Sequence, residues 1–361
     1  MYYWYFFSIK INYMEDSDIN DLRGDGEFKG FSFSKFKKAE VKKELLNSLI
    51  HSKIEPACYW SAELVCSGHY IDLWNVLINF LGKYIHLANP KLAIYLDKRI
   101  QDFRNLMTNG YAGQELRLRN NEKMRELFAE VSAVLCLSNR KPCLEKIPKL
   151  KHEEFEITSM TERFRAPNAS YAEHIFRRED PRELFPAINE LSYNIHAKDI
   201  MRCYYWIEWI LEYEKICKTK KVKCKVDRRE NIPVNEKDQM DVVWLIWDLI
   251  LHYVRNNNEL YKTLINSLLS IFCLRYTNGV ISKRKFIIFY ALSVLTEIVN
   301  FKVNALTDKK VITNVKGKIN LIYKEIKKNE IAPATDYLFN NNVAKSNIDK
   351  TIEKLDIMKN F

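Results

Sequence analysis

Cationic side chains are densest in residues 215–229, where one aspartate stands among eight lysines and arginines. Each Lys or Arg that replaces a condensed counterion on a phosphate adds a salt-dependent increment of affinity, so such a run is suited to binding nucleic acid. The alternatives are a solvated basic loop and a protein or membrane-surface partner. With a second run at residues 283–285, the candidate contact residues are Lys218, Lys220, Lys221, Lys223, Lys225, Arg228, Arg229, Lys283, Arg284 and Lys285.

Cysteine spacing argues against a metal site. Six residues separate Cys217 from Cys224, and six separate Cys136 from Cys143, whereas zinc sites pair cysteines two to four residues apart. Most of the eight cysteines lie in apolar helical patterns, which indicates reduced thiols. We therefore expect no metal and no cofactor.

Two carboxylates, Glu208 and Glu212, lie one helical turn apart on an aromatic segment, where burial could raise a pKa for acid–base work. The nearby cations Arg202 and Lys215 favour ordinary surface ion pairs instead. No Ser/His/Asp or Cys/His pattern has a recognisable local context. We expect no catalytic residue and no enzymatic activity.

Tryptophans recur at helical spacing. Trp206 and Trp209 are three residues apart, as are Trp244 and Trp247, so each pair shares one helix face. Exposed rings could stack on bases, but their mixture with Ile, Leu and Val is typical of a core.

Length and composition limit the fold classes that could position these residues. The chain has 361 residues, 47% of them hydrophobic and 13% aromatic, so most of it should fold into two domains or one large one. With 9 Gly and 9 Pro, the many-turned β-sandwich and barrel classes are disfavoured. The net charge of +11 favours acidic partners.

Apolar periodicity predicts helices along most of the chain, including 71–87, 92–107, 122–137, 260–274 and 286–299. The sequence therefore predicts an all-α fold of two helical bundles joined by a Pro-rich connector. The expected parts are a flexible N-terminal arm (1–34), bundle 1 (35–138), the connector (139–180), bundle 2 (181–300) and a basic C-terminal helical tail (301–361).

A possible internal repeat relates the two bundles. The segment from His51 to the Tyr59-Trp60 pair can be laid on the segment from His196 to Tyr205-Trp206 when one residue is inserted. An aromatic-rich helix follows in both places, which fits two related bundles, although the match is short enough to arise by chance. In this alignment His51 and His196 are matching structural histidines at a helix end.

Five short blocks of the sequence are 30–33 (GFSF), 57–64 (ACYWSAEL), 89–92 (NPKL), 166–168 (APN) and 203–210 (CYYWIEWI). Through these blocks the chain resembles, over about residues 29–296, an uncharacterised protein family of nucleocytoplasmic large DNA viruses, the giant viruses. That family has no assigned activity, so the resemblance implies a viral setting and no catalytic residues.

Residues 54–93 also resemble, more weakly, the helical collar of clamp-loader-like AAA+ ATPases. The order of Ala57-Cys58-Tyr59-Trp60, Gly68 and Ala88-Asn89-Pro90 is similar. The chain contains no G-x-x-x-x-G-K-[ST] loop, so ATPase chemistry does not carry over. The resemblance implies a collar-like module for oligomerisation or for a position near DNA.

The functional expectation is a non-catalytic viral scaffold or accessory factor that contacts nucleic acid or a replication or transcription complex through the basic cluster. The alternative is a structural or assembly component of the virion that acts through protein contacts. Nucleic acid and viral proteins are the expected partners, in the host cytoplasm (viral factory) or the virion. We expect no signal peptide and no membrane span, and Met14 is an alternative start to Met1.

Overall fold

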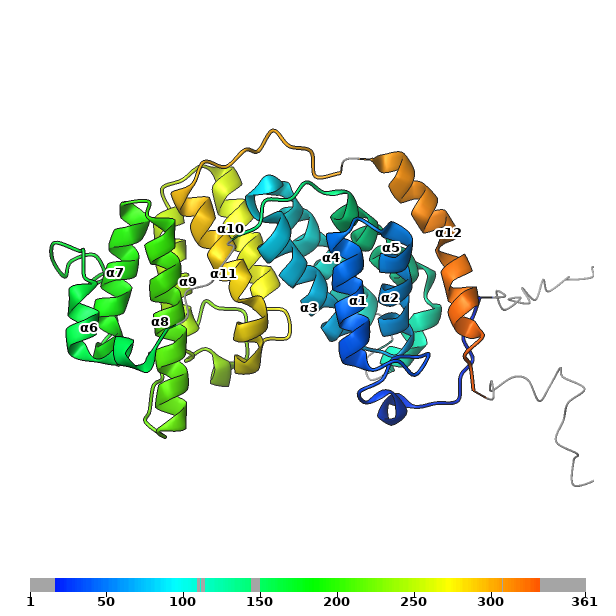
Figure 1. Ribbon diagram of the computed structural model, residues 1–361, viewed down its shortest axis with the longest axis horizontal. Helices are drawn as coiled ribbons and strands as arrows, with labels where there is room; N and C mark the ends of the chain where they lie inside the picture. Colours follow the sequence, from blue (N-terminus) through cyan, green and yellow to red (C-terminus); the bar gives the residue numbers. More distant parts are fainter. Residues whose placement is uncertain (1–16, 109–110, 112–113, 144–149, 307, 332–361) are drawn as a thin grey trace, which may run out of the picture.

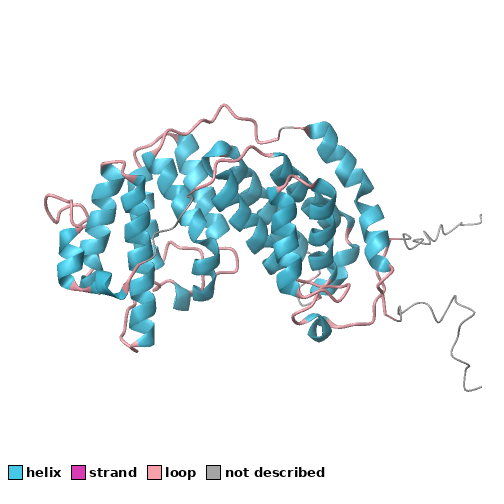
Figure 2. Ribbon diagram, viewed as in Figure 1, coloured by secondary structure: helices cyan, strands magenta, loops and turns pink. Residues whose placement is uncertain are grey.

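A computed structural model describes residues 17–108, 111, 114–143, 150–306 and 308–331. Every regular element in this part of the chain is a helix, as Figure 2 shows. The nearest approach to a sheet there is an isolated antiparallel bridge between Phe31 and Lys37. The prediction of an all-α fold is confirmed.

Helices α1 to α5 form the first half of the molecule (Figure 1). Their inner faces carry the apolar side chains that the periodicity predicts, and an asparagine, Asn121, caps α5 by accepting a hydrogen bond from the Met124 N–H at 3.0 Å. The helices are α1 (Lys38–Ile50), α2 (Ile54–Cys66), α3 (Tyr70–Phe80), α4 (Lys91–Thr108) and α5 (Glu122–Leu137).

Helices α6 to α11 form the second half, and α12 returns to the first. Residue types that favour the N-cap position again precede several of these helices. The side chains of Asp199, Asn258 and Asp308 accept hydrogen bonds from backbone N–H groups in the first turns of α8, α10 and α12. The helices are α6 (Ile157–Glu162), α7 (Phe185–His196), α8 (Ile200–Thr219), α9 (Val243–Val254), α10 (Glu259–Phe272), α11 (Ile281–Thr296) and α12 (Lys309–Lys327).

The two halves share one continuous hydrophobic core, because α4 packs on α10 and α3 packs on α11. The helix predicted over 71–87 ends at Phe80 and continues as a π-helical turn, η2 (Leu81–Ile85), that also packs on α11. Gly82 makes this approach possible, since a Cβ there would lie 3.0 Å from the backbone of Phe286. The bundles are therefore joined face to face rather than through the connector alone.

Residues 17–34 do not form the flexible arm that the sequence predicted. Ile19, Phe28 and Phe33 are buried, and the Arg23 guanidinium lies over both phenylalanine rings while it pairs with Asp21 at 2.5 Å. Polar residues and glycines suggested flexibility, but three spaced apolar side chains are enough to bind this segment to the first half. Residues 1–16 of the predicted arm lie outside the described residues.

The C-terminal part also packs more closely than expected. Helix α12 lies against α2 and α5, and it buries Tyr323 under the guanidinium of Arg125 at 4.2 Å from the ring centroid. It is thus a sixth helix of the first half, reached by the long segment that crosses from α11 (Figure 1). Residues 332–361 of the predicted tail lie outside the described residues.

Part of the connector is bound to the helices of the second half. In residues 150–180 the backbone N–H groups of Arg165 and Ala166 donate to the buried Glu190 carboxylate of α7 at 2.8–3.0 Å. Trp209 of α8 donates from Nε1 to the Glu154 carbonyl oxygen at 2.9 Å. These bonds fasten a segment of low periodicity to α7 and α8, which sequence periodicity does not reveal.

The turn after α1 and the turn after α7 have the same geometry. Ser52 (φ 55°) and Lys198 (φ 57°) each occupy the left-handed position after a helix, with the same two capping hydrogen bonds across it. In the helices that follow, the Tyr59-Trp60 rings meet edge to face at 5.1 Å and 83°, and the Tyr205-Trp206 rings at 5.1 Å and 82°. Local geometry therefore supports the internal repeat.

The same geometry corrects the sequence alignment. With Ser52 placed on Lys198, the aromatic pairs align without an inserted residue. His196 is the last residue of α7, whereas His51 is the cap beyond α1, so the match of His51 with His196 is wrong by one position.

No helix in the described part of the chain is both long enough and apolar enough to cross a bilayer.

Candidate nucleic-acid interface

Helix α8 carries the first basic run at its C-terminal end. It has 20 residues where its counterpart α2 has 13, and the seven additional residues make about two further turns. Figure 1 shows this end extending below its neighbours α7 and α9. Residues 218–223, hereafter the lysine loop, cover that end.

The lysine loop has a defined backbone. Lys221 takes a left-handed conformation (φ 57°), and the Val222 N–H donates to the Cys217 carbonyl oxygen at 2.9 Å, which closes the helix with a six-residue cap. Cys217 and Cys224 are buried on either side of the loop. Burial and the neighbouring Cys217 raise the pKa of the Cys224 thiol to about 12, so Cys224 is a neutral anchor.

Three lysines of the loop present free charges. Lys220, Lys221 and Lys223 are exposed, and within the described structure their ammonium groups contact no carboxylate and no hydrogen-bond acceptor. Lys218 is exposed too, but it pairs with Glu214 at 2.9 Å and donates to Asn278 at 2.5 Å. Three of the predicted contact residues are therefore gathered, unpaired, at one projecting end.

The remaining residues of the first run are engaged within the protein. Lys225 pairs with the buried Asp241 at 2.7 Å, and Arg228 pairs with Glu236 at 3.2 Å, although both cations remain partly exposed. Arg229 is different, because it is 1% exposed.

Arg229 is not a contact residue, contrary to the sequence prediction. Its guanidinium binds both oxygens of Asp180 at 2.6 Å and Asp248 at 2.8 Å. An arginine held by two carboxylates inside the fold has no donor to offer to a phosphate. It fastens the connector to the segment that follows the lysine loop.

The second basic run, residues 283–285, also contains both exposed and buried cations. Lys283 is exposed, and in the described structure its ammonium group contacts no partner. Arg284 is fully buried and donates to the Phe272 and Leu274 carbonyl oxygens at 2.8 and 2.6 Å and to Asn75 of α3. Burial lowers its pKa to about 10. The prediction that Arg284 contacts a ligand is wrong, because it bridges the two halves.

Lys285, the last residue of this run, pairs with Glu208 at 2.7 Å. Lys285, Lys218, Glu208 and Glu214 line one cavity of about 230 Å³ between α8 and α11. The structure thus brings one member of each run to the same cavity beside α8, where each pairs with a carboxylate.

Both carboxylates considered for acid–base chemistry form ion pairs with lysines. Glu208 holds Lys285, and Glu212 holds Lys215 at 2.7 Å. Trp74, Trp206, Trp209, Trp244 and Trp247 are buried, as expected for core residues.

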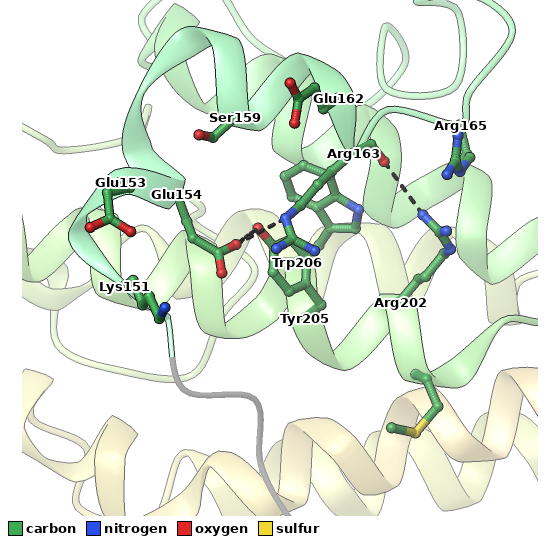
Figure 3. A pocket seen from close by; sticks show the side chains of 11 residues that line it. Lys151, Glu153, Glu154, Ser159, Glu162, Arg163, Arg165, Arg202, Tyr205 and Trp206 are labelled. Atoms are coloured by element: carbon green, nitrogen blue, oxygen red, sulfur yellow. Dashed lines mark hydrogen bonds and ion pairs between the residues drawn. The ribbon is translucent and has the colours of Figure 1, made fainter.

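A second cavity, of about 660 Å³, lies between the connector and α8 (Figure 3). Glu154 is its organising group: it accepts from the Tyr205 hydroxyl at 2.5 Å and pairs with Arg163 at 2.9 Å, while the Arg163 guanidinium lies 4.7 Å from the Tyr205 ring centroid. Burial and Glu154 raise the pKa of Tyr205, so its hydroxyl stays a donor. These contacts hold the connector in place, and charges of both signs line the cavity.

No group of three or more His, Cys, Asp or Glu side chains in the described residues is arranged to hold a metal ion. The cysteines among them are all free thiols, and seven of the eight are buried.

Sequence reasoning missed a group of arginines at the end of the connector and directly after it. Arg177, Arg178 and Arg182 line a third cavity, of about 450 Å³, beside the segment that carries Arg228 and Arg229. Their spacing around Asp180-Pro181 was visible in the sequence, but the region was interpreted as a linker because it lacks periodicity.

The chain matches no protein-family model, no curated protein and no solved structure.

Proposed function

We propose that this protein is a non-catalytic helical scaffold or accessory factor that binds the phosphate backbone of nucleic acid through the lysine loop. The observation that carries the proposal is the set of exposed, unpaired ammonium groups of Lys220, Lys221 and Lys223 at the projecting end of α8. Lys218 lies at the same end of α8 and is also exposed.

Charge pairing within the two basic runs distinguishes the lysine loop from the other residues of those runs. Most cations of the basic runs meet a carboxylate, for example Lys225 with Asp241 and Lys285 with Glu208. Unpaired lysines retain their full attraction for a polyanion, because no internal carboxylate competes with the phosphates. The buried cysteines at both ends of the loop limit the conformational entropy that binding must remove.

Nucleic acid is the polyanion favoured by the chain's net charge of +11. The resemblance to a giant-virus family supports a viral setting, in which a replication or transcription complex would supply the nucleic acid.

Charge reversal of the loop tests the proposal. We expect Lys220→Glu/Lys221→Glu/Lys223→Glu to weaken binding to a labelled DNA or RNA oligonucleotide at least about tenfold at 100 mM salt, because three phosphate contacts become repulsive. Fluorescence anisotropy measures the affinity. The substituted side chains are exposed, so the fold should be unchanged, which circular dichroism checks.

A charge-matched control uses α12, which lies at the opposite end of the molecule from α8 (Figure 1). Lys309→Glu/Lys310→Glu/Lys318→Glu makes the same change in net charge on exposed residues. Equal losses of affinity in both variants would show that net charge alone drives binding, and would refute a site at the lysine loop.

A further inference from the structure

The cavity lined by Arg177, Arg178 and Arg182 has the composition of a binding site for an unstacked base. We propose that this cavity, the arginine pocket, receives one base and its phosphate from a single-stranded nucleic acid whose neighbouring phosphates bind the lysine loop. This inference rests on the proposed function and adds a preference for single strands. The pocket residues are Phe176, Arg177, Arg178, Arg182, Phe185 and Pro186, with Asp180 at its wall.

The pocket combines aromatic surface with enough space for a small ligand. Phe176 and Phe185 meet edge to face, with ring centroids 5.0 Å apart, and both are partly exposed. The cavity volume of about 450 Å³ lies in the range of small-ligand sites. Aromatic rings and planar guanidinium groups are the surfaces on which proteins stack single-stranded bases.

Three arginines and one aspartate are the charged residues that line the pocket. Arg178 and Arg182 are exposed, and in the described structure their guanidinium groups have no partner. Arg177 donates through Nη1 to the Arg228 carbonyl oxygen at 2.7 Å, which orients it at the pocket. The one carboxylate of the wall, Asp180, is neutralised by the buried Arg229. Guanidinium groups bind phosphate through paired donors, so this arrangement suits a nucleotide phosphate.

A short segment joins the lysine loop to the pocket. The Asp227 N–H donates to Asp180 at 2.8 Å, so the segment after the loop is bound to the pocket wall. Asp227 follows Lys223 by four positions, and a fully extended chain over four positions spans at most about 14 Å. A single strand can therefore reach both features within a few nucleotides.

A duplex cannot use the pocket in this way. Its bases are stacked on both faces, and presenting one to Phe176 or Phe185 requires unpairing it first. The lysine loop contacts the phosphates of single-stranded and of duplex nucleic acid alike, whereas the pocket adds affinity only for an unpaired base. The geometry therefore gives single strands the higher affinity.

Binding of a (dT)12 oligonucleotide and of a 12-base-pair duplex tests this inference. We expect the wild-type protein to prefer the single strand by about fivefold or more, as expected for one stacked base. Phe176→Leu, which keeps an apolar side chain but removes the ring, should reduce this preference towards one and leave duplex affinity unchanged. Arg178→Glu/Arg182→Glu, at exposed positions, should weaken single-strand binding more than duplex binding.

The outcomes separate the two proposals. If the lysine-loop variant loses affinity for both oligonucleotides but the pocket variants keep the wild-type ratio, the arginine pocket is refuted and the lysine loop stands. If the wild-type protein binds neither oligonucleotide, or prefers the duplex, the pocket inference is also refuted. A mononucleotide such as dTMP should compete weakly, because it lacks the phosphates that reach the loop; competition as strong as that of (dT)12 would identify a free-nucleotide site instead.

Discussion

Arg229 and Lys221 lie eight residues apart in one basic run, yet they have opposite roles. Arg229 is enclosed by Asp180 and Asp248, which are 49 and 19 residues away in sequence, while Lys221 projects unpaired into solvent. A run of cations predicts a binding surface only to the extent that its members lack internal partners. Those partners come from distant segments, so the sequence alone could not separate the enclosed cations of the run from the exposed ones.

The role of Arg229 leads to a stability prediction. Arg229→Met leaves two carboxylates without their common partner, and we expect it to lower the free energy of unfolding by about 3 kcal/mol, as when a buried ion pair is broken. Lys221→Met should change it by less than about 0.5 kcal/mol, as is usual at exposed sites. Urea denaturation measures both, and similar values for the two variants would contradict the assigned roles.

His86 gives the fold a dependence on pH. It is buried against Tyr290, with ring centroids 4.8 Å apart, and burial lowers its pKa from 6.5 to about 4. Because the unfolded state binds the proton more tightly, this stabilisation is complete above pH 6.5 and is lost as pH falls towards 4. The shift corresponds to about 3 kcal/mol.

The pH prediction is checked with His86→Asn, since asparagine does not titrate and tolerates the positive φ of this position (49°). Between pH 7 and 4.5 the unfolding free energy of the variant should fall less steeply than that of the wild-type protein. Parallel curves would show that His86 does not titrate with unfolding.

At the level of elements, the sequence predicted helix type well and helix ends less well. The bounds of α5 agree with the expected 122–137, because an uninterrupted apolar face ends at Asn121 on one side and Ser138 on the other. The helix expected at 286–299 spans Ile281–Thr296 instead, since the charged run at 283–285 hides the apolar pattern of its first turn. The packing of α12 on α2 and α5 depends on tertiary contacts that periodicity does not contain.

The close packing of the π-helical turn η2 on α11 makes the stability of the fold sensitive to a methyl group added at Gly82. Gly82→Ala would place Cβ 3.0 Å from the carbonyl carbon and oxygen of Phe286, so η2 and α11 must move apart. We expect a loss of about 1–3 kcal/mol in the free energy of unfolding, as for other overpacked sites.

Gly317→Ala is the matched control, because nothing lies within 4 Å of the added methyl group on the exposed side of α12. Alanine is the better helix former, so this variant should be more stable than wild type by up to about 1 kcal/mol. Thermal or urea unfolding distinguishes the two. Equal effects would mean that η2 and α11 are not in close contact.

At the scale of the whole molecule, the shared core makes the two halves one folding unit. Arg284 of α11 bonds to Asn75 of α3, and α4 packs along α10, so neither half can unfold without exposing the apolar surface of the other. We expect a single calorimetric transition whose van't Hoff and calorimetric enthalpies agree. Two separate transitions would indicate independent bundles, as the sequence alone had suggested.

The candidate site combines segments that the sequence interpretation assigned to different parts of the molecule. The lysine loop belongs to bundle 2 of the sequence interpretation, and the arginine pocket to its connector and the start of α7. The bonds of Asp180 to Arg229 and to Asp227 join them. Long-range pairs of this kind are fixed by the folded arrangement and leave no local pattern.

The most direct test of the central claim is the salt dependence of nucleic-acid binding by the wild-type protein and by Lys220→Glu/Lys221→Glu/Lys223→Glu. Each phosphate contact contributes about 0.9 to the slope of log affinity against log salt on duplex DNA, so three contacts alone predict a loss of about 40-fold between 50 and 200 mM salt. The variant should lose about 2.7 from the magnitude of that slope. The same slope in both proteins would contradict binding through the lysine loop.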